Sequence, residues 1–124
     1  MYTIDNHSGV PVYEQIIRQT EKFILIGILS KDSPMPSVRA VAAEITANPN
    51  TIQKAYTDLL RREILYAVPG KGSFVSAKAR DILRRELERE LATVETMAAQ
   101  FASAGIDKQE VLDAVERGYS QSKE

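Results

Sequence analysis

Apolar residues follow helical spacing in the segment between Tyr13 and about Gly27, which predicts an amphipathic helix. Pro11 suits the first turn of that helix, because the N–H group that proline lacks has no intrahelical partner there. Residues 1–10 show no comparable period, so we expect them to form a loose N-terminal start.

Two shorter helices are expected after a connector rich in turn-forming residues. Ser37 is a typical N-cap residue for the first of them. Asn48 followed by Pro49 is a typical start for the second, which should run to about Arg62. Only residues 46–47 separate the two, so the pattern predicts two helices joined by a tight turn.

A β-hairpin is expected directly after these helices. Residues 64–68 and 73–76 are short stretches of β-branched and aromatic residues, and they flank a turn with two glycines. Lys71 stands between Gly70 and Gly72 at the tip of this turn. Such a tip could approach DNA closely, although an ordinary hairpin turn also favours glycine and a soluble lysine.

The helix that begins at Asn48 has two faces of different chemistry. At about 100° per residue, its apolar side chains fall on one stripe: Ile52, Ala55, Tyr56, Leu59 and Leu60. The opposite face carries only uncharged polar and basic side chains: Asn50, Gln53, Lys54, Thr57 and Arg61. Asn and Gln can pair with adenine, and Lys can contact guanine or phosphate. An ordinary solvated helix face is the alternative interpretation.

The C-terminal part is expected to contain two helices. The first covers about residues 78–104 and carries an apolar seam at alternating spacings of four and three: Leu87, Leu91, Val94, Ala98 and Phe101. We expect this seam to pair two copies of the chain, with packing against the chain's own N-terminal part as the alternative. A final helix is expected after Asp107.

Composition excludes several classes of protein. The chain has no cysteine, which rules out disulfides and thiolate zinc sites. The first residues do not resemble a signal peptide, and the longest apolar run, residues 23–29, is far too short to span a membrane. We therefore expect a cytoplasmic protein with no membrane partner. The formal net charge of −1 does not mark a nucleic-acid binder, so the placement of charges must decide.

Catalytic chemistry finds little support in the sequence. His7 is the only histidine, and it lies in the expected loose start. The carboxylates are scattered over predicted helix surfaces rather than paired. We therefore expect no catalytic residue, no bound metal and no cofactor.

Together these elements predict a mainly α fold with a small β-hairpin, arranged as a winged helix-turn-helix and followed by a two-helix dimerisation segment. The expected division is residues 1–76 for DNA binding and residues 77–124 for dimerisation. A winged helix that binds only another protein remains the rival interpretation.

Four motifs, in this order, resemble the signatures of the GntR family of transcription regulators, and the N-P-N-T helix start resembles its YtrA-type subfamily. They are PVYEQI at residues 11–16, MPSVR at 35–39, NPNTIQKAY at 48–56 and GKGSFV at 70–75. Two positions depart from the family pattern. Asp32-Ser33 stands where the family has Gly-Asp, and Glu63 replaces the glycine that ends the DNA-facing helix.

The resemblance implies a homodimer that binds double-stranded operator DNA of two-fold symmetry. The residues that it places at the DNA are Ser37, Arg39, Asn48, Asn50, Thr51, Gln53, Lys54, Gly70, Lys71 and Gly72. We expect repression by occlusion of a promoter. An unidentified small-molecule effector, bound between subunits, is left open.

Overall fold

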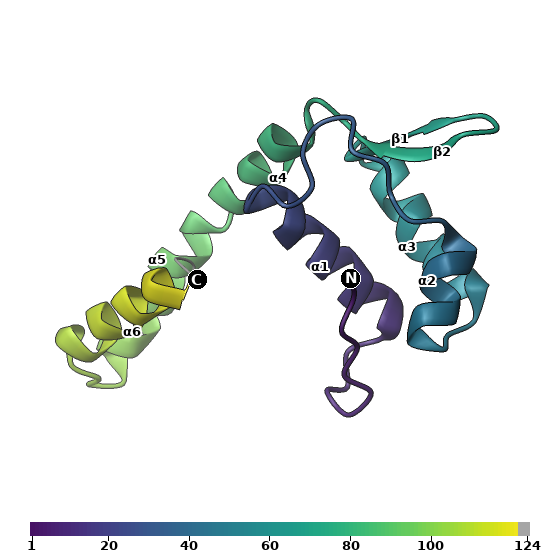
Figure 1. The fold of residues 1–124 in the computed structure, drawn as a ribbon. Helices are drawn as coiled ribbons and strands as arrows, with labels where there is room; N and C mark the ends of the chain where they lie inside the picture. The colour runs from purple at the N-terminus through teal and green to yellow at the C-terminus, as the bar shows by residue number, and fades with distance from the viewer. Residues whose placement is uncertain (122–124) are drawn as a thin grey trace. The chain divides into compact units, whose positions relative to one another are not determined.

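The computed structural model describes residues 1–121, and these form helices with one two-stranded antiparallel sheet, as predicted (Figure 1). The elements in chain order are α1 (Val12–Leu25), α2 (Val38–Ile45), α3 (Pro49–Arg61), β1 (Leu65–Val68), β2 (Gly72–Val75), α4 (Ala79–Glu88), α5 (Leu91–Ser103) and α6 (Lys108–Gln121). The chain forms two compact units, Met1–Arg85 and a second that begins at Glu86.

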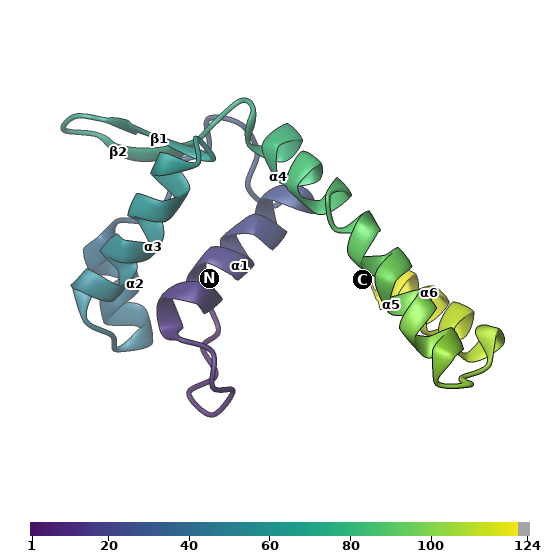
Figure 2. The same ribbon diagram turned by 180° about the vertical axis from the view of Figure 1, so that it is seen from behind.

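The first unit has one hydrophobic core, to which α1, α2, α3, the hairpin and α4 contribute buried side chains. Figure 2 shows the ribbon of these elements from behind. Fully buried side chains of this core come from α1, α2, α3 and the hairpin: Ile16, Val41, Ile52, Leu59, Ile64, Leu65 and Val75. Helix α3 packs on both α1 and α2. Burial of one face of α3 against two helices fixes which of its residues face outward.

The hairpin is supported by the connector that precedes α2. Strand β1 pairs with β2 in the register Leu65↔Val75 and Val68↔Gly72. On the other edge of β2, Asp32 N–H donates to the Val75 carbonyl at 2.7 Å, and Met35 N–H donates to the Ser73 carbonyl at 2.8 Å. The connector therefore forms an isolated β-bridge, between Pro34 and Phe74, at the edge of β2 and ties the hairpin to the helices.

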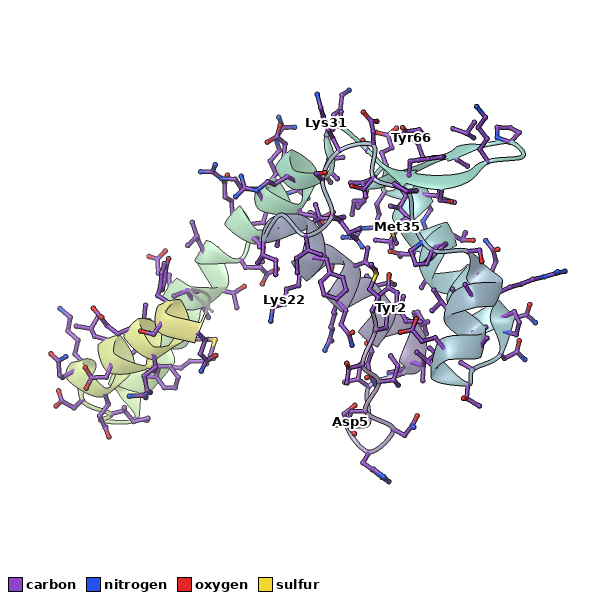
Figure 3. The ribbon with its side chains drawn as sticks, viewed as in Figure 1. Tyr2, Asp5, Lys22, Lys31, Met35 and Tyr66 are labelled. Atoms are coloured by element: carbon purple, nitrogen blue, oxygen red, sulfur yellow. The ribbon has the colours of Figure 1, made fainter. Side chains whose placement is uncertain are left out.

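The N-terminal segment is ordered, so the expectation of a loose start was wrong. The side-chain amide of Gln19 donates to the Thr3 carbonyl and accepts from the Thr3 N–H. Gln15 makes the same pair of bonds with Asp5, which lies in the loop before α1 (Figure 3). Tyr2 is buried, and its hydroxyl lies 2.7 Å from Thr20 Oγ1. Hydrogen bonds from α1, rather than periodicity, hold this segment.

The single long helix expected over residues 78–104 is interrupted, so that expectation was also wrong. Helix α4 ends at Glu88, and α5 begins at Leu91. At the break Glu90 N–H donates to the Leu87 carbonyl, a bond one residue shorter than in an α-helix. Neither glycine nor proline stands there, so composition gave no signal of the interruption.

Helix α4 contributes to the first unit although the expected DNA-binding domain ended at residue 76. Ala79 and Leu83 are buried in the core that α1 and α3 form. The compact unit therefore continues to Arg85. That residues 1–76 bind DNA and residues 77–124 join two copies of the chain stays a proposal.

Helices α5 and α6 lie side by side in the second unit (Figure 1). None of their residues is fully buried. Within residues 1–121, no helix is both long and apolar enough to cross a membrane.

Glu63, which stands where the family pattern has glycine, adopts a left-handed backbone conformation that favours glycine. Its φ is +62°, directly after α3. Because a non-glycine residue pays roughly 1 kcal/mol in this conformation, Glu63→Gly should raise the free energy of unfolding by about 1 kcal/mol. Thermal denaturation should then show a higher Tm, by about 4–8 °C for a unit of this size. Glu63→Ala is the matched control, since it keeps the strain; a Tm for the glycine variant no higher than this control would contradict the account.

Candidate nucleic-acid interface

Helices α2 and α3 form the predicted helix-turn-helix, and side-chain caps define where each begins. Ser37 Oγ accepts from the Ala40 N–H at 3.1 Å, and Asn48 Oδ1 accepts from the Asn50 N–H at 2.9 Å. Thr46, with φ of +53°, makes the left-handed turn that ends α2. These local bonds set the start of α3 and thereby the positions of its first exposed side chains.

The two faces of α3 are arranged as the sequence predicted. Its buried residues are Ile52, Ala55, Tyr56 and Leu59. The residues exposed along its other side are Asn50, Gln53, Lys54, Thr57 and Arg61. Tyr56 fixes the helix against the connector, because its hydroxyl donates to the Pro36 carbonyl at 2.7 Å. Burial raises the pKa of Tyr56, so this donor stays protonated.

The other residues expected at DNA that lie in α2 and α3 or cap them differ in their exposure. Ser37, Arg39 and Asn48 are exposed, while Thr51 is half-buried. The capping bonds occupy the side-chain oxygens of Ser37 and Asn48, so Asn48 keeps its NH2 group for a ligand. Arg39 has no ion-pair partner within residues 1–121, so no carboxylate there competes with an anionic ligand for its guanidinium group.

The tip of the hairpin presents one cation between two glycines in the left-handed region. Gly70 has φ of +78° and Gly72 has φ of +111°. Lys71 is exposed, and its N–H donates to the Val68 carbonyl at 2.9 Å to close the turn. A side chain at either glycine would be strained.

Electrostatics on α3 favour an anionic ligand. Asp58 is the one acidic residue of the helix, and two arginines pair with it. Arg61 lies 3.1 Å and Arg62 lies 2.9 Å from its carboxylate oxygens. Arg62 also bridges to Glu21 of α1 at 2.6 Å, which fastens α3 to α1. The negative charge of Asp58 is thus compensated on the helix itself.

A shallow hollow of about 460 Å³ lies along the exposed face of α3. Its lining residues come from α3 and from the first turn of α1: Tyr13, Asn50, Gln53, Lys54, Thr57, Asp58 and Arg61. Tyr13 was not among the predicted DNA contacts, although it stands in the PVYEQI motif. Its spacing marked it only as a residue of the first helix.

The five seam residues of the C-terminal part lie on two helices, Leu87 on α4 and the other four on α5, and all are at least partly exposed. Exposed fractions are 56% for Leu87, 67% for Leu91 and 54% for Val94. Ala98 is exposed and Phe101 is half-buried. Large exposed apolar side chains at helical spacing are typical of a surface that another helix covers.

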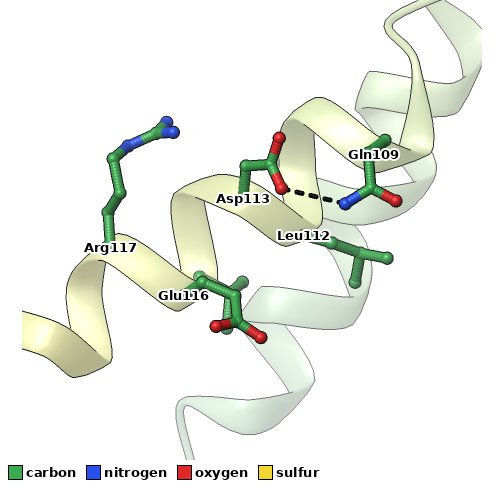
Figure 4. A pocket seen from close by; sticks show the side chains of 6 residues that line it. Gln109, Leu112, Asp113, Glu116 and Arg117 are labelled. Atoms are coloured by element: carbon green, nitrogen blue, oxygen red, sulfur yellow. Dashed lines mark hydrogen bonds between the residues drawn. The ribbon is translucent and has the colours of Figure 1, made fainter.

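Another hollow lies on α6 (Figure 4). Its polar residues are exposed, and Gln109 Nε2 donates to Asp113 Oδ1 at 2.9 Å. Because it exposes two carboxylates, Asp113 and Glu116, it does not suit a nucleic acid. Within residues 1–121 no group of three or more potential metal ligands is present.

Sequence comparisons match these features to known regulators. A family model described as "Bacterial regulatory proteins, gntR family" matches residues 12–75. The HTH-type transcriptional repressor YtrA of Bacillus subtilis is 43% identical over 83 residues, 67% of this chain and 64% of that protein. The chain thus covers less than two thirds of that repressor. The uncharacterized HTH-type transcriptional regulator YhcF of the same species is 34% identical over 110 residues, 87% of this chain and 89% of that protein.

Two solved structures resemble the chain over nearly its whole length, and a third resembles about three fifths of it. A transcriptional antiterminator from Listeria monocytogenes EGD-e has a TM-score of 0.74 at 26% identity, covering 98% of this chain and 92% of its own. A GntR family transcriptional regulator from Listeria monocytogenes has a TM-score of 0.73 at 28% identity, with 92% and 98% covered. The DNA-binding domain of AraR, solved in complex with operator ORR3, has a TM-score of 0.53 at 26% identity, with 61% and 92% covered.

Proposed function

Because this chain belongs to the GntR family of bacterial regulatory proteins, we propose that it is a homodimeric, cytoplasmic repressor that binds double-stranded operator DNA. The exposed face of α3 enters the major groove, and the hairpin contacts the neighbouring backbone. The observation that carries the proposal is the pair of faces on α3. Its apolar side is buried, while Asn50, Gln53 and Lys54 are exposed together.

The two-fold symmetry of the proposed dimer requires an operator with matching two-fold symmetry. Two copies joined through the seam residues of α5 present two α3 helices to successive major grooves, about 34 Å apart along the duplex. A two-fold protein reads an operator of two-fold symmetry, since each subunit contacts one half-site. Occupancy of such an operator within a promoter excludes RNA polymerase. YtrA of Bacillus subtilis, which is named as a repressor, supports this choice of repression.

Lys54→Ala tests whether α3 faces DNA phosphate. We expect weaker binding to every duplex and a salt dependence of log K that is less steep by about 1.8, because each of the two subunits loses one phosphate contact. Fluorescence anisotropy with labelled duplex DNA at a series of salt concentrations measures both quantities. Lys22→Ala is the matched control, because Lys22 is an exposed lysine of α1 away from the hollow.

The control should bind as the wild type does. Equal affinity and equal salt dependence for Lys54→Ala and the wild type would show that α3 does not meet the backbone. No binding of wild-type protein to any duplex at low salt would instead favour a winged helix that contacts only proteins.

A further inference from the structure

Lys54 on α3 points its charge at an aromatic ring of another helix. The Lys54 Nζ atom lies 3.8 Å from the centroid of the Tyr13 ring, in the first turn of α1. Both residues line the hollow along the exposed face of α3. The distance is well inside the range of a cation–π interaction, which extends to about 6 Å.

No carboxylate competes for this ammonium group. Asp58, one turn further along α3, pairs with Arg61 and Arg62. Within residues 1–121, Lys54 takes part in no ion pair. The ring of Tyr13 is therefore its charge-stabilising contact.

A ring holds a lysine in a way that leaves it able to bind phosphate. An ion pair would use N–H donors of the ammonium group and would have to break before a phosphate could replace the carboxylate. The ring instead attracts the cation without a carboxylate acceptor, so the N–H donors that are directed away from the ring stay available. It also restricts a long flexible side chain before binding, which reduces the entropy lost when the phosphate contact forms.

We propose that Tyr13 is a positioning residue for DNA binding, which holds the Lys54 ammonium group where a backbone phosphate of the duplex meets it. The proposal rests on the proposed function, because it presumes that α3 faces DNA. It extends the interface to α1, a helix that holds none of the predicted DNA contacts. The recognised ligand is the phosphodiester backbone, so the effect should not depend on base sequence.

A double-mutant cycle with a labelled mixed-sequence duplex at low salt tests the coupling. Tyr13→Leu should weaken binding about two- to fivefold for each bound subunit, the change that a surface cation–π interaction supports. In the Lys54→Ala background the same replacement should have no further effect, because the group that it positions is absent. A purely structural role of Tyr13 predicts the same loss in both backgrounds, and that result would overturn the proposal.

Two further measurements are needed. One distinguishes the effect of the Tyr13 ring from that of its hydroxyl group, and the other distinguishes positioning of Lys54 from a direct contact between Tyr13 and DNA. Tyr13→Phe should bind as the wild type does, because it keeps the ring and loses only the 3.4 Å bond to Glu14. The salt dependence of Tyr13→Leu should equal that of the wild type, since Lys54 still reaches the phosphate. A Phe variant as weak as the Leu variant would assign the effect to the hydroxyl and overturn the proposal.

Separate controls test whether each variant folds and whether the wild-type protein binds DNA. Circular dichroism melting checks each variant, and Tyr13→Met replaces Tyr13→Leu if the latter does not fold, because methionine fills irregular space well. If wild-type protein fails to bind the duplex, the proposed function fails. If it binds and the cycle shows no coupling, only the role of Tyr13 fails.

Discussion

Replacement of Leu91 and Val94 by aspartate together is expected to turn the homodimer into a monomer. The two side chains are 67% and 54% exposed, and in the proposed dimer they pack against the second copy. Each dimer would then bury four carboxylates in an apolar seam, which costs far more than the contacts there can return. Light scattering at micromolar concentration should show a single monomeric species.

The same variant should lose DNA affinity although its DNA-binding surface is unchanged. Two linked half-site contacts strengthen binding by about 100- to 10,000-fold over one, so we expect a loss of at least about 100-fold in gel shifts with the protein's own upstream DNA. Thr96→Asp with Gln100→Asp is the matched control, because it adds the same charge at exposed polar positions of α5. A double seam variant that remains dimeric would show that α5 does not join the subunits.

Asn50→Ala is expected to abolish much of the discrimination between operator and other DNA. A side-chain amide that pairs with adenine contributes about 1–3 kcal/mol of specificity in each half-site, which is roughly a 5- to 150-fold ratio of dissociation constants per half-site. Affinity for a mixed-sequence duplex should change little, because no phosphate contact is lost. Competition binding of upstream DNA against mixed-sequence duplex measures the ratio.

Gln100→Ala provides the control for this second result, as an exposed amide on α5. It should leave the ratio unchanged. If Asn50→Ala keeps the wild-type ratio, then Asn50 does not read a base. In that case specificity must come from other positions on α3 or from the hairpin.

The elements with strong local signals could be predicted from the sequence. Ser37 and Asn48 cap α2 and α3 through bonds to backbone groups two or three residues away, so residue type and position were sufficient. The two faces of α3 followed from its period, because Ile52 and Tyr56 are buried and Lys54 is exposed. The hairpin followed from its turn, with boundaries within a residue of those observed.

Features that depend on contacts between distant residues were not predictable in this way. Gln15 and Gln19 order the N-terminal segment through bonds to Thr3 and Asp5, and no sequence period signals such bonds. The contact between Lys54 and the Tyr13 ring joins residues 41 positions apart.

Two further features could not be predicted from the sequence: the break between α4 and α5, and the role of each residue expected at DNA. The break between α4 and α5 rests on a single shifted hydrogen bond at Glu90, without a glycine or proline to mark it. The roles of the predicted DNA contacts stay predictions, because they need the ligand itself.

Site-directed photocrosslinking tests most directly whether the exposed face of α3 lies against DNA. A photoreactive amino acid is placed at Gln53, an exposed residue that lines the hollow on that face, and in a second variant at Gln100 on α5. Each protein is irradiated with the duplex upstream of its own gene. The account predicts a covalent protein–DNA product from position 53 and none from position 100. A variant that shifts the duplex in a gel but forms no product from position 53 would contradict it.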